Sequence, residues 1–182
     1  MKSRILAIAS AVVCTAASLG IGTALAQGSK SASPMDQLGE FVGDGTCTGQ
    51  VMAMGKDPGH ATTGKYHGEK TLDGHWIVVH YDEDQTAANP KPFHLQQFFG
   101  YDAAKKRYVA VLFENSDETY ATGTSQGWKG ETVTFDESMG GKSGMFRDVF
   151  TRGPSGMASH AGWMKDKSGK WAKTDEETCK PS

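Results

Sequence analysis

Hydrophobic and polar residues alternate with a period of two along much of the chain after residue 38. In residues 93–101, for example, Phe, Leu, Gln, Phe and Tyr interleave with His, Gln, Phe and Gly. Strands point successive side chains to opposite faces of a sheet, so this period predicts strands. Groups of Gly, Asp, Asn, Ser and Pro separate the segments, as turns do. The expected strands are residues 39–54, 61–72, 75–81, 93–101, 107–115, 119–128, 131–137, 144–152, 157–165 and 170–179.

The spacing of these segments favours sequential hairpins. No stretch between them is long enough for the crossover that a parallel pair of strands requires. Hairpins that follow one another in a curling sheet close into an up-and-down barrel. The predicted fold class is therefore all-β: a single antiparallel barrel of about ten strands, with a two-sheet sandwich as the alternative.

The first strand is unusually rich in glycine. A helix is disfavoured there, because each glycine loses backbone entropy without packing a side chain. In strands, glycine marks bends and close approaches of neighbouring backbones, which a closing sheet needs. The glycines of this segment are Gly39, Gly43, Gly45 and Gly49.

Two cysteines lie near opposite ends of the predicted barrel. Cys47 is in the first expected strand, and Cys179 ends the last one. A disulfide between them would place the first and last strands side by side, as barrel closure requires. The third cysteine, Cys14, lies in a segment that we expect to be removed.

The N-terminus has the features of a secretory signal peptide. Lys2 and Arg4 precede an apolar run over residues 5–19, and Ala-Leu-Ala at 24–26 provides small residues for cleavage. A membrane anchor is the weaker alternative, because the run is short and rich in Ala and Gly. We expect a signal peptide over residues 1–26, a flexible leader over 27–37 and a barrel domain over 38–182. The expected location is the periplasm or the exterior, where disulfides persist.

Charge and composition exclude some classes of function. The chain has 19 basic and 21 acidic residues and no basic run, which argues against nucleic-acid binding. No membrane span is expected after signal cleavage. One turn of helix is predicted near Met35, with Ser33 as its cap and Pro34 in its first position.

Several turn motifs together resemble the DUF1579 family of exported, lipocalin-like bacterial proteins of unknown function. They are a Gly-rich first strand (39–46), Leu-Asp-Gly-His-Trp (72–76), Gly-Tyr-Asp-Ala-Ala-Lys-Lys-Arg-Tyr-Val (100–109) and Arg147 before a last hairpin. The resemblance covers nearly the whole mature chain. It implies a calycin-type barrel, related in architecture to lipocalins and fatty-acid-binding proteins, and it brings no catalytic residues.

One hairpin offers candidate metal ligands. If Asp73-Gly74 forms a two-residue turn, His67 faces His80 across the hairpin, with Glu69 diagonal to His80. Two histidines and a carboxylate have the reach of a metal site. The alternative is a solvated pair on the outer face, and the alternation does not say which face is inside.

Residues 93–101 and 107–115 contribute the most continuous apolar stripe, which we expect to line a ligand cavity. Arg147, between Phe and Met neighbours, is the predicted polar anchor, although an outward position is equally compatible with the pattern. A buried guanidinium would favour an anionic amphiphile such as a fatty acid. The candidate stripe consists of Phe93, Leu95, Gln97, Phe99, Tyr101, Tyr108 and Leu112.

Other chemistry has less support. His160, on a late strand, is the candidate axial ligand if the barrel holds haem. No Gly-x-Ser-x-Gly elbow, P-loop or dinucleotide-binding motif is present, so the chain is more typical of a binding protein than of an enzyme. Three functions remain open: a binding barrel for a small apolar or amphiphilic ligand, a metal- or haem-binding barrel or small enzyme, and a ligand-free structural or interaction module. The pattern identifies neither the ligand nor the oligomeric state.

Overall fold

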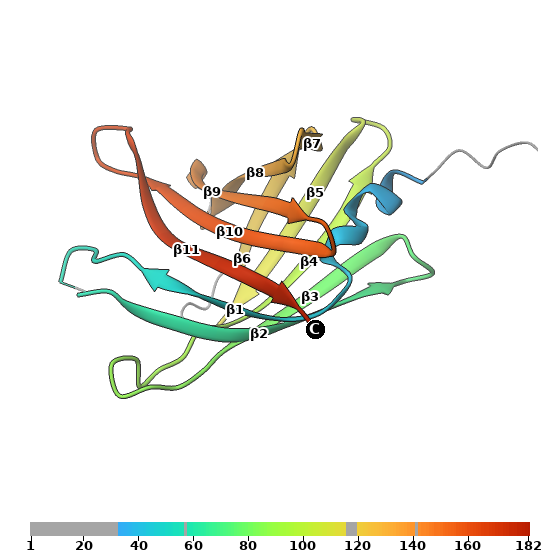
Figure 1. The fold of residues 1–182 in the computed structure, drawn as a ribbon. Coiled ribbons are helices and arrows are strands. Elements are labelled where there is room, and N and C mark those ends of the chain that lie inside the picture. Colours follow the sequence, from blue (N-terminus) through green and yellow to red (C-terminus); the bar gives the residue numbers. More distant parts are fainter. Residues whose placement is uncertain (1–32, 57, 116–119, 141) are drawn as a thin grey trace, which may run out of the picture. The chain divides into compact units, whose positions relative to one another are not determined.

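The computed structural model describes residues 33–56, 58–115, 120–140 and 142–182. The described residues form one short 3-10 helix and eleven strands (Figure 1). In chain order these elements are η1 (Pro34–Phe41), β1 (Gly43–Val51), β2 (His60–Thr71), β3 (Trp76–Glu83), β4 (His94–Asp102), β5 (Arg107–Glu114), β6 (Tyr120–Ser125), β7 (Trp128–Lys129), β8 (Thr132–Met139), β9 (Lys142–Gly153), β10 (Gly156–Lys165) and β11 (Trp171–Pro181).

The sheet closes on itself. Neighbouring strands follow the order β6-β5-β4-β3-β2-β1-β11-β10-β9-β8, and β6 also pairs with β8. All of these pairings are antiparallel. In the described part of the chain, ten strands therefore form a closed barrel, while the two-residue β7 lies beside β8. This confirms the predicted barrel, and the sandwich alternative is wrong.

The first and last strands meet as the cysteines predict. β1 pairs with β11 in a register that sets Cys47 directly opposite Cys179, and a disulfide joins the two residues. Both cysteines are almost fully buried, so the disulfide belongs to the barrel core.

Glycines in β1 and β2 make room for a ring and a carbonyl group that pack against the strand backbone. A Cβ atom on Gly45 would meet the Tyr66 ring at 2.2 Å, and one on Gly68 would meet the Phe41 carbonyl oxygen at 1.7 Å. These positions therefore require glycine because a side chain has no space. The expected first strand begins too early, since Gly39 to Phe41 belong to the helix.

The helix closes one end of the barrel. Ser33 caps η1, and Pro34 occupies its first position, as predicted. Phe41, at the end of η1, stacks on Phe99 with ring centroids 4.5 Å apart and meets Phe150 edge-on at 4.9 Å. Hydrophobic burial of this kind drives the docking of so short a helix, which would not be stable alone.

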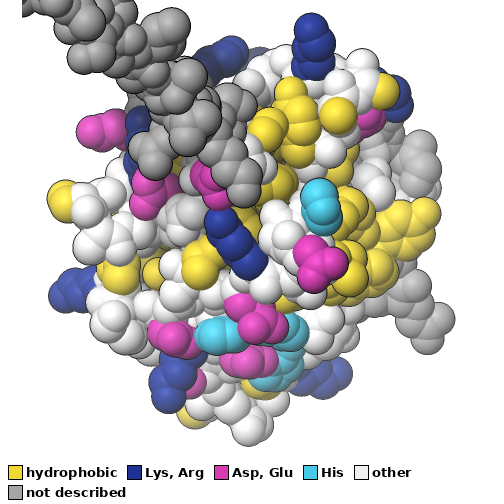
Figure 2. Space-filling view, turned by 90° about the vertical axis from the view of Figure 1, so that its right-hand side faces the viewer, with side chains coloured by type: hydrophobic (Ala, Val, Ile, Leu, Met, Phe, Trp, Pro, Cys, Tyr) yellow, Lys and Arg dark blue, Asp and Glu magenta, His cyan; other side chains and the backbone are white. Residues whose placement is uncertain are grey.

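Met35 is also part of this core, with an exposed fraction of 5%. The ordered domain therefore starts before residue 38, and the end of the expected leader is packed rather than free. Figure 2 looks onto this end of the barrel and shows basic, acidic, histidine and hydrophobic side chains interspersed on its surface.

The β2–β3 hairpin has the register expected from its turn. Thr71 pairs with Trp76, and His67 pairs with His80. Asp73 and Gly74 have φ values of 57° and 80°, the left-handed conformation that such a turn requires.

The signal-peptide prediction falls on residues outside the described part of the chain. Among the described residues, no helix combines the length and hydrophobicity that a membrane crossing would need.

Candidate functional site

The barrel interior has an apolar half and a polar half. Next to η1 it is filled by aromatic and aliphatic side chains, including the fully buried Phe99 and Phe135. Toward the other end, where β3 ends and β4 begins, the inward positions carry carboxylates, an imidazole and amide groups. Alternation places them there, because Gln97 and Asp148 are each two residues from a buried phenylalanine on the same strand.

His160 on β10 is held between two carboxylates from neighbouring strands. Its Nε2 lies 3.3 Å from Asp148 Oδ1 on β9, and its Nδ1 lies 3.2 Å from Asp175 Oδ1 on β11. Burial lowers the pKa of His160, but hydrogen bonds and charges from both aspartates outweigh it and raise the pKa well above the usual range. His160 is therefore an imidazolium at neutral pH, with both ring nitrogens donating.

The pKa of Asp175 shifts in the opposite direction, below its usual value. Burial raises the pKa of its carboxyl group, but hydrogen bonding and charge from His160 and a hydrogen bond from Thr174 leave it below its usual value. The pair is thus ionised across the neutral range.

Glu137 on β8 is the most perturbed carboxyl group of the site. Burial, the charge of Asp148 and a hydrogen bond with Asp148 raise its pKa from 4.5 to about 9. Its exposed fraction is 4%, and the Gln97 amide donates to both Glu137 (3.5 Å) and Asp148 (3.3 Å). Glu137 is protonated at neutral pH, so it can share this proton with the Asp148 carboxylate, and the two carboxyl groups do not repel each other.

A second group of inward polar residues extends this network. The Tyr81 hydroxyl donates to Glu177 Oε1 at 2.5 Å, and the Thr62 hydroxyl donates to the same oxygen at 2.9 Å. Burial and the nearby Glu177 raise the pKa of Tyr81 far above its usual value, so Tyr81 remains a donor.

One more buried carboxyl group lies close to this network. Glu83, at the end of β3, accepts from Asn89 at 2.7 Å and lies 3.0 Å from the His60 ring.

Solvent reaches part of this network. The side chains of His160 and Asp175 are 22% and 29% exposed, although they point inward. His160 and Glu177 also line a hollow of about 460 Å³ together with the exposed Thr48, Gln50 and Thr178 of β1 and β11. The polar half is therefore partly exposed at His160 and Asp175, whereas the apolar half is packed core.

The members of the predicted lumen stripe on β4 and β5 lie on the strand face that carries the buried core. Phe93 directly precedes β4 in the chain. The register pairs Phe99 with Ile77 and Ala110, both buried, and this identifies the inner face. Three of the seven members, however, pack in the core near η1, and Tyr108 donates to the Pro34 carbonyl of η1 at 2.9 Å. The members nearer the polar half are Phe93, Leu95, Gln97 and Leu112; those packed near η1 are Phe99, Tyr101 and Tyr108.

Arg147 does not anchor a ligand inside the barrel, so that prediction is wrong. Its Nε and Nη2 bond Asp136 Oδ1, each at 2.7 Å, and its guanidinium lies 4.3 Å from the Trp171 ring centroid. Its partner Asp136 on β8 is exposed. On β9, the residue that follows Arg147, Asp148, takes the inward position. The alternation of β9 thus puts a carboxylate inside where a guanidinium was expected.

The metal and haem predictions also need correction. His67 bonds Asp44 at 2.8 Å on the exposed face. His67, His80 and Glu69 do not form a metal-binding group. Among the described residues, no group of three or more His, Cys, Asp or Glu side chains is placed to hold a metal ion. His160 is inward, but both of its nitrogens already have carboxylate partners. An axial ligand needs a free nitrogen, so this geometry does not suit haem iron.

Sequence reasoning missed Glu137, Asp148 and Asp175. The signal was present on two strands, because Glu137 shares a face with Val133 and Phe135, and Asp148 shares a face with Phe150. A carboxylate at an otherwise apolar alternating position marks a buried polar site.

The chain matches no protein-family model, and no curated protein is similar enough to count as a relative. The DUF1579 resemblance therefore stays a prediction.

Proposed function

We propose that the protein is an exported barrel that binds one small molecule through the mouth opposite η1. The observation that carries this proposal is the partly exposed polar half of the interior, centred on His160 and its two aspartates. Perturbed titratable groups on a concave inner surface are typical of binding sites. The buried disulfide supports export, since such bonds persist in oxidising compartments.

The charge of this inner surface determines which ligand suits it. The carboxylates of Asp148, Asp175 and Glu177 outnumber the one imidazolium of His160, so the inner wall is electronegative. An anionic amphiphile, the ligand class expected from Arg147, would be repelled there. The proposed ligand carries an ammonium or other donor group toward these carboxylates.

Apolar surface lies beside the carboxylates. Leu95 on β4 and Phe146 on β9 are half-buried, and Leu112 on β5 is 8% exposed. Register places Leu112 opposite Gln97 and Phe146 opposite Glu137. The apolar part of an amphiphilic amine would pack on these side chains, while its charged end meets the acidic wall.

The test compares matched probes by isothermal titration calorimetry. Dodecylamine should bind more tightly than dodecanoate, and Asp175→Asn should weaken dodecylamine binding by about tenfold because a charge-assisted hydrogen bond is lost. Asp44→Asn is the matched control, since Asp44 also pairs with a histidine, but on the exposed face. Tighter binding of dodecanoate, or equal losses in both variants, would refute the proposal.

A further inference from the structure

The barrel wall has an opening between β6 and β8 that is separate from the interior site. The two strands pair from Ala121–Met139 to Thr124–Asp136, and β7 then pairs with β8 at Trp128–Val133. Between these points Thr134 has a strand partner only on β9. A gap of this kind leaves a hollow in the wall that side chains line.

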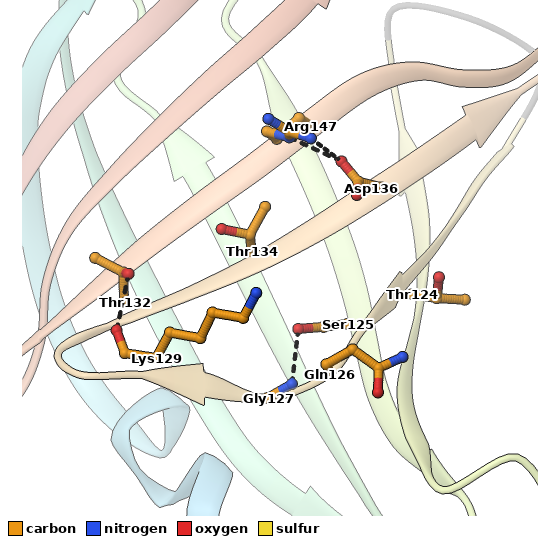
Figure 3. A pocket seen from close by; sticks show the side chains of 9 residues that line it. All are labelled: Thr124, Ser125, Gln126, Gly127, Lys129, Thr132, Thr134, Asp136 and Arg147. Carbon is orange, nitrogen blue, oxygen red and sulfur yellow. Dashed lines mark hydrogen bonds and ion pairs between the residues drawn. The ribbon is translucent and has the colours of Figure 1, made fainter.

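The hollow has a volume of about 350 Å³, and its lining is polar (Figure 3). Gln126, Lys129 and Asp136 are exposed, so it opens to solvent. The volume is in the range of small-molecule sites. Its lining is dominated by hydroxyl, amide and charged groups: Thr124, Ser125, Gln126, Gly127, Lys129, Thr132, Thr134, Asp136 and Arg147.

Two cations border this hollow, and the ammonium group of one, Lys129, has no partner among the described residues. Figure 3 shows the Lys129 side chain extending from β7 toward the space between Ser125 and Thr134. Within the described ranges, nothing accepts a hydrogen bond from its ammonium group or pairs with it. An ammonium directed into a polar hollow is suited to binding an anionic group.

The Arg147–Asp136 pair supplies both a donor and an acceptor. The guanidinium uses Nε and Nη2 on a single oxygen, Asp136 Oδ1, and rests on Trp171, which holds it in place. Arg147 Nη1 and Asp136 Oδ2 have no partner among the residues that the structure describes, so the first can donate to a ligand and the second can accept from it.

Hydroxyl groups complete the lining. Thr124 and Thr134 make no side-chain hydrogen bond within the described part of the chain. Ser125 Oγ accepts from the Gly127 amide at 3.1 Å and keeps its own proton to donate. Such neutral donors and acceptors match the hydroxyl groups of a sugar, and they would not select a bare inorganic anion.

We propose that this hollow binds a small polyhydroxylated anion, a sugar that carries a phosphate or carboxylate group. Lys129 holds the anionic group, while Arg147, Asp136 and the hydroxyl side chains contact the sugar. The site is independent of the interior site, because Arg147 and Asp136 lie outside the barrel and His160 lies inside.

Titration of the ¹⁵N-labelled protein, followed by NMR, tests this proposal. The probes are glucose 6-phosphate, glucuronate, glucose and inorganic phosphate. We expect shifts at residues 124–134 and 147, with glucose 6-phosphate or glucuronate binding at least tenfold more tightly than glucose or phosphate. Lys129→Met should weaken binding of the sugar anion about tenfold, whereas Lys65→Met, on exposed β2, should not change it.

Each other outcome overturns part or all of the proposal. Equal affinity for inorganic phosphate would overturn the polyol assignment, and equal affinity for glucose would overturn the anion assignment. No shift at these residues with any probe would overturn the site. Unchanged binding in a folded Lys129→Met variant would overturn the role of Lys129, and thermal unfolding of each variant establishes that it is folded.

Discussion

The buried Glu137 should make the protein more stable in mild acid than at neutral pH, and Glu137→Gln should remove this dependence. Glutamine has nearly the same shape and keeps a donor for Asp148, but it does not titrate. In the wild type, burial and Asp148 raise the pKa of Glu137 from 4.5 to about 9. A carboxyl group with a raised folded pKa contributes stability below its unfolded value and loses that contribution as pH rises toward the folded value.

The magnitude follows from this pKa difference. Between pH 4.5 and 7 the unfolded chain releases the Glu137 proton while the folded protein keeps it. The slope rises from about 0.7 kcal/mol per pH unit at pH 4.5, where the unfolded group is half ionised, to about 1.4 kcal/mol per unit near pH 7, so the free energy of unfolding falls by about 3 kcal/mol in total. His160, whose pKa is also raised, acts in the same direction. Subtracting wild type from Glu137→Gln at each pH removes most of the effect of His160.

Urea unfolding at pH 4.5, 5.5 and 7 measures the free energy of both proteins. The difference between Glu137→Gln and wild type should grow by about 3 kcal/mol in favour of the variant from the lowest to the highest pH. Glu69→Gln is the control, because Glu69 is exposed on β2, and its difference from wild type should stay constant. A Glu137→Gln difference that is the same at all three pH values would show that Glu137 ionises normally in the folded protein.

Two further predictions concern the core. Reduction of the Cys47–Cys179 disulfide, which closes a loop of 132 residues, should lower the free energy of unfolding by about 5 kcal/mol on the chain-entropy model. Urea unfolding with and without reductant measures this difference. A change below about 1 kcal/mol would reject the prediction. Phe41→Ala should cost about 3–5 kcal/mol because it removes the ring that stacks on Phe99 and meets Phe150 edge-on. The exposed Val42→Ala is its control, with an expected change within about 0.5 kcal/mol in the same urea assay; similar losses in both variants would contradict a core role for Phe41.

The sequence by itself determined the features that depend on local chemistry. Period-two alternation located ten strands within a few residues of their observed ends, and Asp73-Gly74 set the register of the β2–β3 hairpin. Two cysteines in the terminal strands predicted the closing pair. Each of these signals is local or pairwise, so neighbouring residues suffice to interpret it.

Only the tertiary structure decided which face of each strand points inward. Alternation says that Arg147 and Asp148 lie on opposite faces, but both faces of β9 carry apolar residues. The choice depends on the partner strands: β8 brings the buried Phe135 opposite Asp148 and the exposed Asp136 opposite Arg147. Closure of the sheet then gathers carboxylates from β8, β9 and β11 around His160, although they are far apart in the sequence. Their pKa values arise from this burial and proximity, which no single segment of the chain contains.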